Sequence, residues 1–265
     1  VTVGMGRMLP TELDVGVRVR GIQFARPGRP LPPAQPPHGI TVPRGARRWR
    51  GTAGIRDHEH MTKLRLHNLA LSIDGFATGE GQSLETPFGH AGGRLMQWFF
   101  PTRTFVRTSG HESEAIRAGT RGVDDAFAAA SWDGIGAEIM GRRKFGPQQV
   151  PFHTPVVVLT HHARPDIQVG ETTFLFRELP PEDALALAAE QAGGLDVRLG
   201  GGPSMVREFL QADLVDHMHL VVVPIVLGRG VRLWDGLEGI EERFDVEATP
   251  SPSGVVHYVW TRRAR

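Results

Sequence analysis

The sequence predicts an α/β protein organised around a β-sheet, and two observations carry that prediction. From Met61 onward, apolar runs of strand length alternate with stretches of helical character. The chain has 265 residues and is 40% hydrophobic, so it can bury a full core. One domain over residues 61–265 accounts for the pattern.

The first half of this domain begins with a strand over 63–71. Residues 91–100 carry Leu95, Trp98 and Phe99 on one side, which predicts a short helix. Residues 105–120 are polar and are expected to run over the surface. We also expect a helix over 124–132 and a short strand over 137–140.

The second half contains a helix with clear end signals. Two prolines and two acids, residues 180–183, open it, and Gly193 and Gly194 end it. Strands over 155–160 and 173–176 precede this helix. A strand at 197–199 and a helix from Pro203 follow it, which completes a β-α-β-α unit.

The last elements are strands. An apolar strand over 220–227 contains Pro224, which belongs at a bulge or at a sheet edge. The runs 244–248 and 255–261 are spaced like a hairpin and predict an antiparallel edge.

Residues 1–60 differ from the rest in charge and composition. They hold ten arginines, four acids and eight of the twenty prolines, with no sustained periodicity, and we expect them to be disordered. A basic arm can bind nucleic acid, but this one lacks the interleaved aromatic residues of a nucleic-acid reader. The alternative is that translation begins at Met61, directly before the first strand.

Composition excludes several classes of function. The chain has no cysteine, which removes disulfides, thiolate nucleophiles and cysteine-ligated metals. No apolar run approaches the ~20 residues that span a bilayer, and the start lacks a signal-peptide pattern. We therefore expect a cytoplasmic protein with no membrane partner and no nucleic-acid partner.

A glycine junction at residues 197–205 is the most informative motif. An apolar strand runs into Gly200, Gly201 and Gly202, and Pro203 suits the first position of the helix that follows. Glycines let the backbone approach a ligand closely, and a helix start favours an anion. The junction therefore suits a nucleotide pyrophosphate, and the alternative is a plain glycine-rich turn.

Two further segments carry groups that suit phosphate. Gly141, Arg142, Arg143 and Lys144 follow a strand and open a helical turn, where positive charge makes sense chiefly beside an anion. The alternative is a solvated basic patch. The run 160–164 puts hydroxyl, imidazole and guanidinium groups at another strand end, with no acid to bind a ribose diol, which favours NADP over NAD.

These segments, in this order, resemble those of the dihydrofolate reductase-like reductases, and most closely the branch with the reductase domain of riboflavin biosynthesis. The resemblance runs from about Met61 to the C-terminus. It is carried by the ordered set of runs 71–75, 139–142, 158–160, 199–202 and 223–230.

The resemblance implies a three-layer α/β/α fold with a largely parallel sheet, NADPH as cofactor, a small-molecule substrate and a homodimer. It places the cofactor's phosphates at Gly141, Arg142 and Arg143 and the 2′-phosphate near Thr160 and His161. The segment from Gly200 to Ser204, including Pro203, would cradle the pyrophosphate. Asn68, Ala70 and the loop through Gly75 would approach the nicotinamide. A zinc deaminase, which often accompanies this reductase, needs two cysteines that the chain lacks.

Asp74 is the candidate catalytic residue. It follows the first strand, and a partly shielded carboxyl group there can keep a raised pKa and donate a proton. The alternative is that Asp74 only shapes its turn with Gly75. Asp124 and Asp125 are weaker candidates, because acids in a first helical turn usually serve the helix dipole.

Two pairs of histidines have a spacing that could suit a metal ion, His58 with His60 and His217 with His219. The first lies in the basic segment, and the second has no third ligand nearby in sequence, so we predict no metal.

The sequence thus predicts an NADPH-dependent reductase that transfers hydride to a small heterocyclic, imine or carbonyl substrate. The alternative is a non-catalytic nucleotide-binding protein of the same fold, because a fold does not fix a function.

The first testable expectation concerns residues 1–60. Because they show no periodic apolar face that could dock on a core, their removal should leave NADPH affinity unchanged. Calorimetry on the shortened and full chains measures this. A shortened chain that fails to fold contradicts the expectation.

Overall fold

The computed structural model describes residues 62–83, 85–108, 119–145, 154–162 and 164–264. Contacts divide the chain into two units, residues 1–55 and 56–265, and every described residue belongs to the second. The expectations for residues 1–60 and for most of 105–120 lie outside the described residues.

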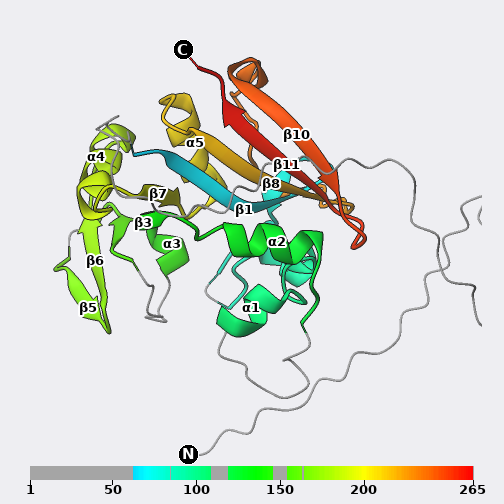
Figure 1. Ribbon diagram of the computed structural model, residues 1–265, viewed down its shortest axis with the longest axis horizontal. Helices are drawn as coiled ribbons and strands as arrows, with labels where there is room; N and C mark the ends of the chain where they lie inside the picture. The colour runs from blue at the N-terminus through cyan, green and yellow to red at the C-terminus, as the bar shows by residue number, and fades with distance from the viewer. Residues whose placement is uncertain (1–61, 84, 109–118, 146–153, 163, 265) are drawn as a thin grey trace, which may run out of the picture. The chain divides into compact units, whose positions relative to one another are not determined.

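A nine-stranded mixed sheet forms the centre of the described unit (Figure 1). Its spatial order is β10-β11-β8-β1-β7-β3-β4-β6-β5. The five pairings from β8 to β6 are parallel, whereas β10, β11 and β5 pair antiparallel at the two edges. The strands are β1 Leu64–Ser72, β3 Ile135–Gly141, β4 Val156–Leu159, β5 Ile167–Val169, β6 Thr172–Arg177, β7 Asp196–Leu199, β8 His217–Val223, β10 Phe244–Pro250 and β11 Val256–Arg262.

Helices cover both faces of this sheet, which gives the three layers that the sequence resemblance implies (Figure 1). On one face, α4 and α5 pack in the larger core cluster together with η2. On the other face, η1 packs in a second cluster, and α2 stacks Phe127 on His219 of β8. The helices are η1 Gly89–Met96, α1 Arg103–Thr108, α2 Val123–Ala130, α3 Arg142–Phe145, α4 Pro181–Gln191, α5 Pro203–Gln211 and η2 Ile240–Arg243.

Several predicted elements need correction. The strand expected over 220–227 is β8, which begins at His217 and ends at Val223, because Pro224 cannot donate to the ladder. The helix expected over 91–100 is the 3₁₀ segment η1, which Gly92 interrupts with φ 54°. Strand β5 and a small second sheet of β2 Phe76–Thr78 and β9 Val231–Arg232 were not predicted from the sequence.

Helix α5 has the amphipathic pattern that the sequence predicts. Its buried side chains, Met205, Val206, Phe209 and Leu210, recur at helical spacing and pack into the larger core cluster. This packing fixes the start of α5 directly behind the glycine junction.

Gly136 is a point of close approach between β3 and the end of α4. A Cβ atom at this position would lie 2.1 Å from the carbonyl oxygen of Ala192. That atom is backbone, so the clash cannot be relieved by turning a side chain.

We therefore expect Gly136→Ala to lower the free energy of unfolding by about 1–3 kcal/mol, the usual cost of overpacking. Gly141→Ala is a matched control in the same strand, because its Cβ would meet only Met205 Sδ at 3.8 Å. Urea denaturation of both variants measures the difference. Equal stability of the two contradicts the close approach.

Candidate functional site

The loops predicted to bind phosphate emerge at one edge of the sheet. Leu199 of β7 pairs with Leu66 of β1 on one side and with Ile139 of β3 on the other. Gly141 pairs in turn with Leu159 of β4. Because these strands are parallel, the residues that follow β7, β3 and β4 leave the sheet side by side, at the end where open α/β sheets bind ligands.

The glycine junction forms an open turn in front of α5. Gly200 donates its N–H to the Ile139 carbonyl at 2.7 Å, and Gly201 and Gly202 have φ 91° and 95°. A Cβ atom at Gly201 or Gly202 would meet no atom of the described residues within 4 Å. The start of α5 has no side-chain cap, so its first N–H groups lack an intrahelical or capping partner. The turn thus presents unbonded backbone N–H groups at the start of α5.

A buried carboxylate, that of Glu138, lies directly against the glycine junction at Gly200. It is fully buried and forms ion pairs with Lys144 of α3 and, at 3.1 Å, with Arg198 of β7. Burial alone would raise the pKa of Glu138, but the two cations outweigh burial and hold it below its usual value. The closest approach is to Gly200, where a Cβ would lie 2.1 Å from Glu138 Oε1.

The basic groups are only partly arranged as the sequence predicts. Arg142 is exposed at the start of α3, and the structure describes Arg143 by its backbone alone. Thr160 is buried, and its hydroxyl accepts the His162 N–H at 3.1 Å. His161 is exposed, with Nδ1 2.9 Å from Glu178. The acid-free strand end inferred from sequence is therefore wrong, because Glu178 reaches it from the end of β6.

Asp74 joins two loops. Its carboxylate accepts the backbone N–H groups of Leu227 at 3.1 Å and Gly228 at 2.7 Å. Desolvation acts to raise its pKa, but hydrogen bonds from Ser72, Gly228 and Leu227 outweigh it and lower the pKa to about 2. The expected raised pKa is therefore wrong, since backbone donors stabilise the ionised form.

Asn68, Ala70 and Gly75 all lie along β1 or directly after it. Asn68 has φ 60°, unusual for a residue other than glycine, and sits where the pairing of β1 with β8 shifts register. Ala70 is buried in the cluster on the η1 face. Gly75 follows the strand with φ 85° and lies beside Trp234.

A chain of hydrogen bonds connects Asn68 to Asp124 through His219 and His257, and no sequence pattern predicts it. His219 Nδ1 lies 3.0 Å from Asn68 Oδ1, and His219 Nε2 lies 2.9 Å from His257 Nδ1. His257 Nε2 lies 2.8 Å from Asp124 Oδ1. Strands β1, β8 and β11 and helix α2 thus contribute one group each. Their sequence separation left no local motif to detect.

Aromatic rings enclose this chain. Phe127 stacks on His257 and His219, with ring centroids 4.4 and 4.6 Å away. Trp98 meets both histidines edge-on, and its buried indole N–H has no hydrogen-bond partner in the described part of the chain. Burial, reinforced by His257 and His217, lowers the pKa of His219 to about 3.

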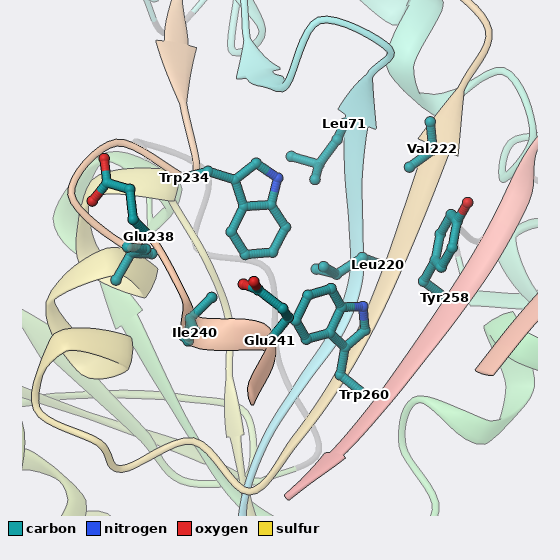
Figure 2. Close-up of a pocket in the computed structure, with 10 residues that line it drawn as sticks. Leu71, Leu220, Val222, Trp234, Glu238, Ile240, Glu241, Tyr258 and Trp260 are labelled. Atoms are coloured by element: carbon teal, nitrogen blue, oxygen red, sulfur yellow. The ribbon is translucent and has the colours of Figure 1, made fainter. Parts of the chain in front are cut away.

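A separate apolar pocket of about 500 Å³ lies on the opposite face of the sheet (Figure 2). Figure 2 shows Trp234 beside Leu71, with Tyr258 and Trp260 of β11 across the pocket. Because Tyr258 directly follows His257, the two side chains point to opposite faces of β11. A smaller hollow around Asp74 shares Leu71, Val222 and Trp234 with this pocket.

Two kinds of feature are absent from the described residues, a metal-binding cluster and a membrane-spanning helix. No group of three or more His, Asp or Glu side chains there is placed to hold a metal ion. No helix in the same residues has the length and apolarity needed to cross a bilayer.

The mostly parallel sheet with helices on both faces defines a three-layer α/β fold. The model of the RibD C-terminal domain family matches residues 65–255. The chain belongs to this family, which confirms the predicted resemblance and supports a reductase-like function.

Solved structures with a similar fold include one described as a riboflavin biosynthesis protein from Shewanella sp. PV-4. It is 20% identical with a TM-score of 0.50, and the match covers 77% of this chain and all of that one. A pyrimidine reductase-like protein from Corynebacterium diphtheriae is 16% identical, with TM-score 0.41 and coverage of 77% and 93%. Dihydrofolate reductase from Enterococcus faecalis, complexed with NADP(H) and RAB-propyl, is 14% identical, with TM-score 0.44 and coverage of 76% and 97%. A comparison with curated proteins finds no match.

The contacts of Asp74 generate a prediction about stability. Asp74→Asn replaces one acceptor oxygen by an NH₂ group that cannot accept an N–H, and we expect it to lower the free energy of unfolding by about 1–2 kcal/mol at pH 7. Because the pKa is depressed in the folded state, this contribution is present above the unfolded pKa and is lost as pH falls toward about 2.

Chemical denaturation of wild type and variant at pH 7 and at pH 2.5 measures both effects. The difference between the two proteins should be smaller at pH 2.5. A difference that is constant or larger in acid contradicts the assigned role of the carboxylate.

Proposed function

We propose that this protein is an NADPH-dependent reductase that transfers hydride to a small heterocyclic, imine or carbonyl substrate. The observation that carries the proposal is the glycine junction, with its open turn and the uncapped start of helix α5. Membership of the RibD C-terminal domain family supports the same chemistry.

The residues at the sheet edge have distinct roles in this proposal. The N–H groups of Gly201, Gly202 and Ser204 bind the pyrophosphate, and Pro203 leaves no competing donor at the first helical position. Arg142 and the backbone of Gly141 and Arg143 face the phosphates from the end of β3. When bound, NADPH supplies the hydride, and the protein supplies position and a route for the proton.

The 2′-phosphate selects between the two nicotinamide cofactors. Thr160 and His161 are the proposed contacts, and His161 lies beside Glu178. The imidazole of His161 can donate a hydrogen bond to Glu178 or to a phosphate. Because Glu178 is an acid at this strand end, the measured preference between NADPH and NADH tests the assignment directly.

Asp74 acts in this proposal by fixing the loops after β1 and β8. A carboxyl group with a pKa of about 2 carries almost no proton at neutral pH, so the proton for the substrate comes from elsewhere.

The alternative function is a protein of the same fold that binds NADPH without turnover. Turnover with a panel of carbonyl, imine and pterin compounds separates the two, because the binding protein saturates with NADPH and oxidises none.

Cofactor choice and the role of Arg142 are tested together by calorimetry. We expect wild type to bind NADPH more tightly than NADH, and Arg142→Gln to weaken NADPH about tenfold, the loss of one charge-assisted hydrogen bond. Arg263→Gln is the control, because Arg263 is also an exposed arginine and directly follows β11.

Equal affinities of the wild type for NADPH and NADH contradict the assignment of the 2′-phosphate. An equal effect of the two substitutions contradicts the assignment of Arg142.

A further inference from the structure

The hydrogen-bonded chain from Asn68 to Asp124 has no part in the proposed phosphate cradle, although the family resemblance places Asn68 near the nicotinamide. His219 and His257 are almost completely buried, and both ring nitrogens of each histidine form hydrogen bonds. The amide of Asn68 ends the chain on one side. The Asp124 carboxylate, 15% exposed, ends it on the other.

The backbone N–H of Asn68 fixes the direction of these hydrogen bonds. The register shift takes it out of the ladder with β8, and it donates to His219 Nδ1 at 3.4 Å. An N–H can only donate, so this nitrogen of His219 carries a lone pair, and the proton of the neutral ring is on Nε2. That proton is donated to His257 Nδ1, which leaves the His257 proton on Nε2 for Asp124.

Asp124 requires the same direction from the other end. Its pKa is lowered, because hydrogen bonds from Ser251, His257 and Ser253 outweigh the effect of burial, and an ionised carboxylate can only accept. His257 must therefore donate from Nε2. The contacts at Asn68 and at Asp124 therefore require the same arrangement, with the protons of both histidines on Nε2.

This arrangement decides the orientation of the Asn68 amide. An oxygen 3.0 Å from a bare ring nitrogen would set two lone pairs against each other. A half-turn of the amide exchanges oxygen and nitrogen with almost no change of shape. The NH₂ group then donates to His219, and the oxygen takes the outer position, which has no hydrogen-bond partner among the described residues.

We propose that Asp124, acting through His257 and His219, holds the Asn68 amide with its oxygen outward, as an acceptor for an amide N–H of a bound ligand. Asn68 is the ligand-binding residue, and the other three are positioning residues. The left-handed backbone at Asn68 is the strain that such a site retains.

Burial and most charged or titratable neighbours lower the pKa of the two histidines and favour their neutral form, whereas Asp124 acts to raise the pKa of His257. His217 on β8 and His257 on β11 both act to lower the pKa of His219, in addition to its burial. Arg65 of β1 bonds His67 and likewise opposes positive charge nearby. Asp124 of α2 is the carboxylate in contact with His257.

The ligand chemistry is that of an amide N–H, which two sources can supply. One is the carboxamide of a nicotinamide cofactor, and the other is a cyclic amide in the substrate. The identity of the ligand rests on the proposed function. The direction of the chain does not, so the two are tested separately.

The direction is tested by ¹⁵N NMR of the full chain at pH 7, which distinguishes protonated from bare ring nitrogens. We expect His219 and His257 both to be neutral with the proton on Nε2. In Asp124→Asn the amide can donate or accept, so only the long 3.4 Å contact from the Asn68 N–H still favours this direction, and a population with protons on Nδ1 should appear. Asp183→Asn, an exposed first-turn acid of α4, is the control and should change neither ring.

An Nδ1 proton or an imidazolium in wild type overturns the proposed direction. Unchanged tautomers in Asp124→Asn overturn the role of Asp124. A purely structural role of the chain would leave the tautomers of the folded Asp124→Asn protein unchanged.

The ligand is tested with two matched pairs of probes. NADPH is compared with its 3-acetylpyridine analogue, which lacks the carboxamide N–H, and 2-pyridone with N-methyl-2-pyridone, with and without NADPH. We expect the N–H member of at least one pair to bind about fivefold to tenfold more tightly. Asn68→Gly keeps the left-handed backbone and should abolish that difference.

The indole signals locate the pyridone. A shift at Trp98 places it beside the histidine chain, and a shift confined to Trp234 and Trp260 places it in the opposite pocket and contradicts the proposal. Equal binding within both pairs, or a difference that survives Asn68→Gly, also overturns it. Failure of the proposed function alone would appear as absent NADPH binding with the tautomers as expected.

Discussion

The buried ion pairs of Glu138 are the constraint on which the candidate site depends. A buried carboxylate needs charged partners and hydrogen bonds, and removing one partner is strongly destabilising. Glu138 on β3 takes Lys144 from α3 and Arg198 from β7. The segment after β3, which carries Lys144, and the end of β7, which carries Arg198, therefore cannot move apart without leaving a charge unpaired. The same carboxylate explains why residue 200 must be glycine, because a side chain there would enter its space.

The fold follows from local patterns to a large extent. The β-α-β-α unit through α4 and α5 was predictable, because helix end signals and apolar spacing are local properties of the chain. The end of β8 was not predicted correctly, because Pro224 stops the strand at Val223 and not at the expected residue 227. The second sheet was not predictable, since β2 and β9 are two or three residues long and owe their pairing to tertiary contacts.

The candidate site divides in the same way. Parallel pairing makes the junction loops converge, so Gly200 to Ser204, Arg142 and Thr160 could be placed from sequence. Asp74 was placed correctly at the strand end, but its pKa depends on donors from residues 227 and 228, more than 150 positions away. Glu178 and the chain from Asn68 to Asp124 are likewise assembled from distant segments. No spacing rule reveals such contacts.

The central claim is that the carboxyl edge around the glycine junction binds the nicotinamide cofactor. Hydrogen exchange of the full chain, with and without NADPH, tests it most directly, because backbone N–H groups are the proposed phosphate ligands. Slowed exchange at Gly201, Gly202 and Ser204, together with Arg142 and Arg143, is the predicted result. Unchanged exchange there, with protection around Trp234 and Ile240 instead, would contradict the claim.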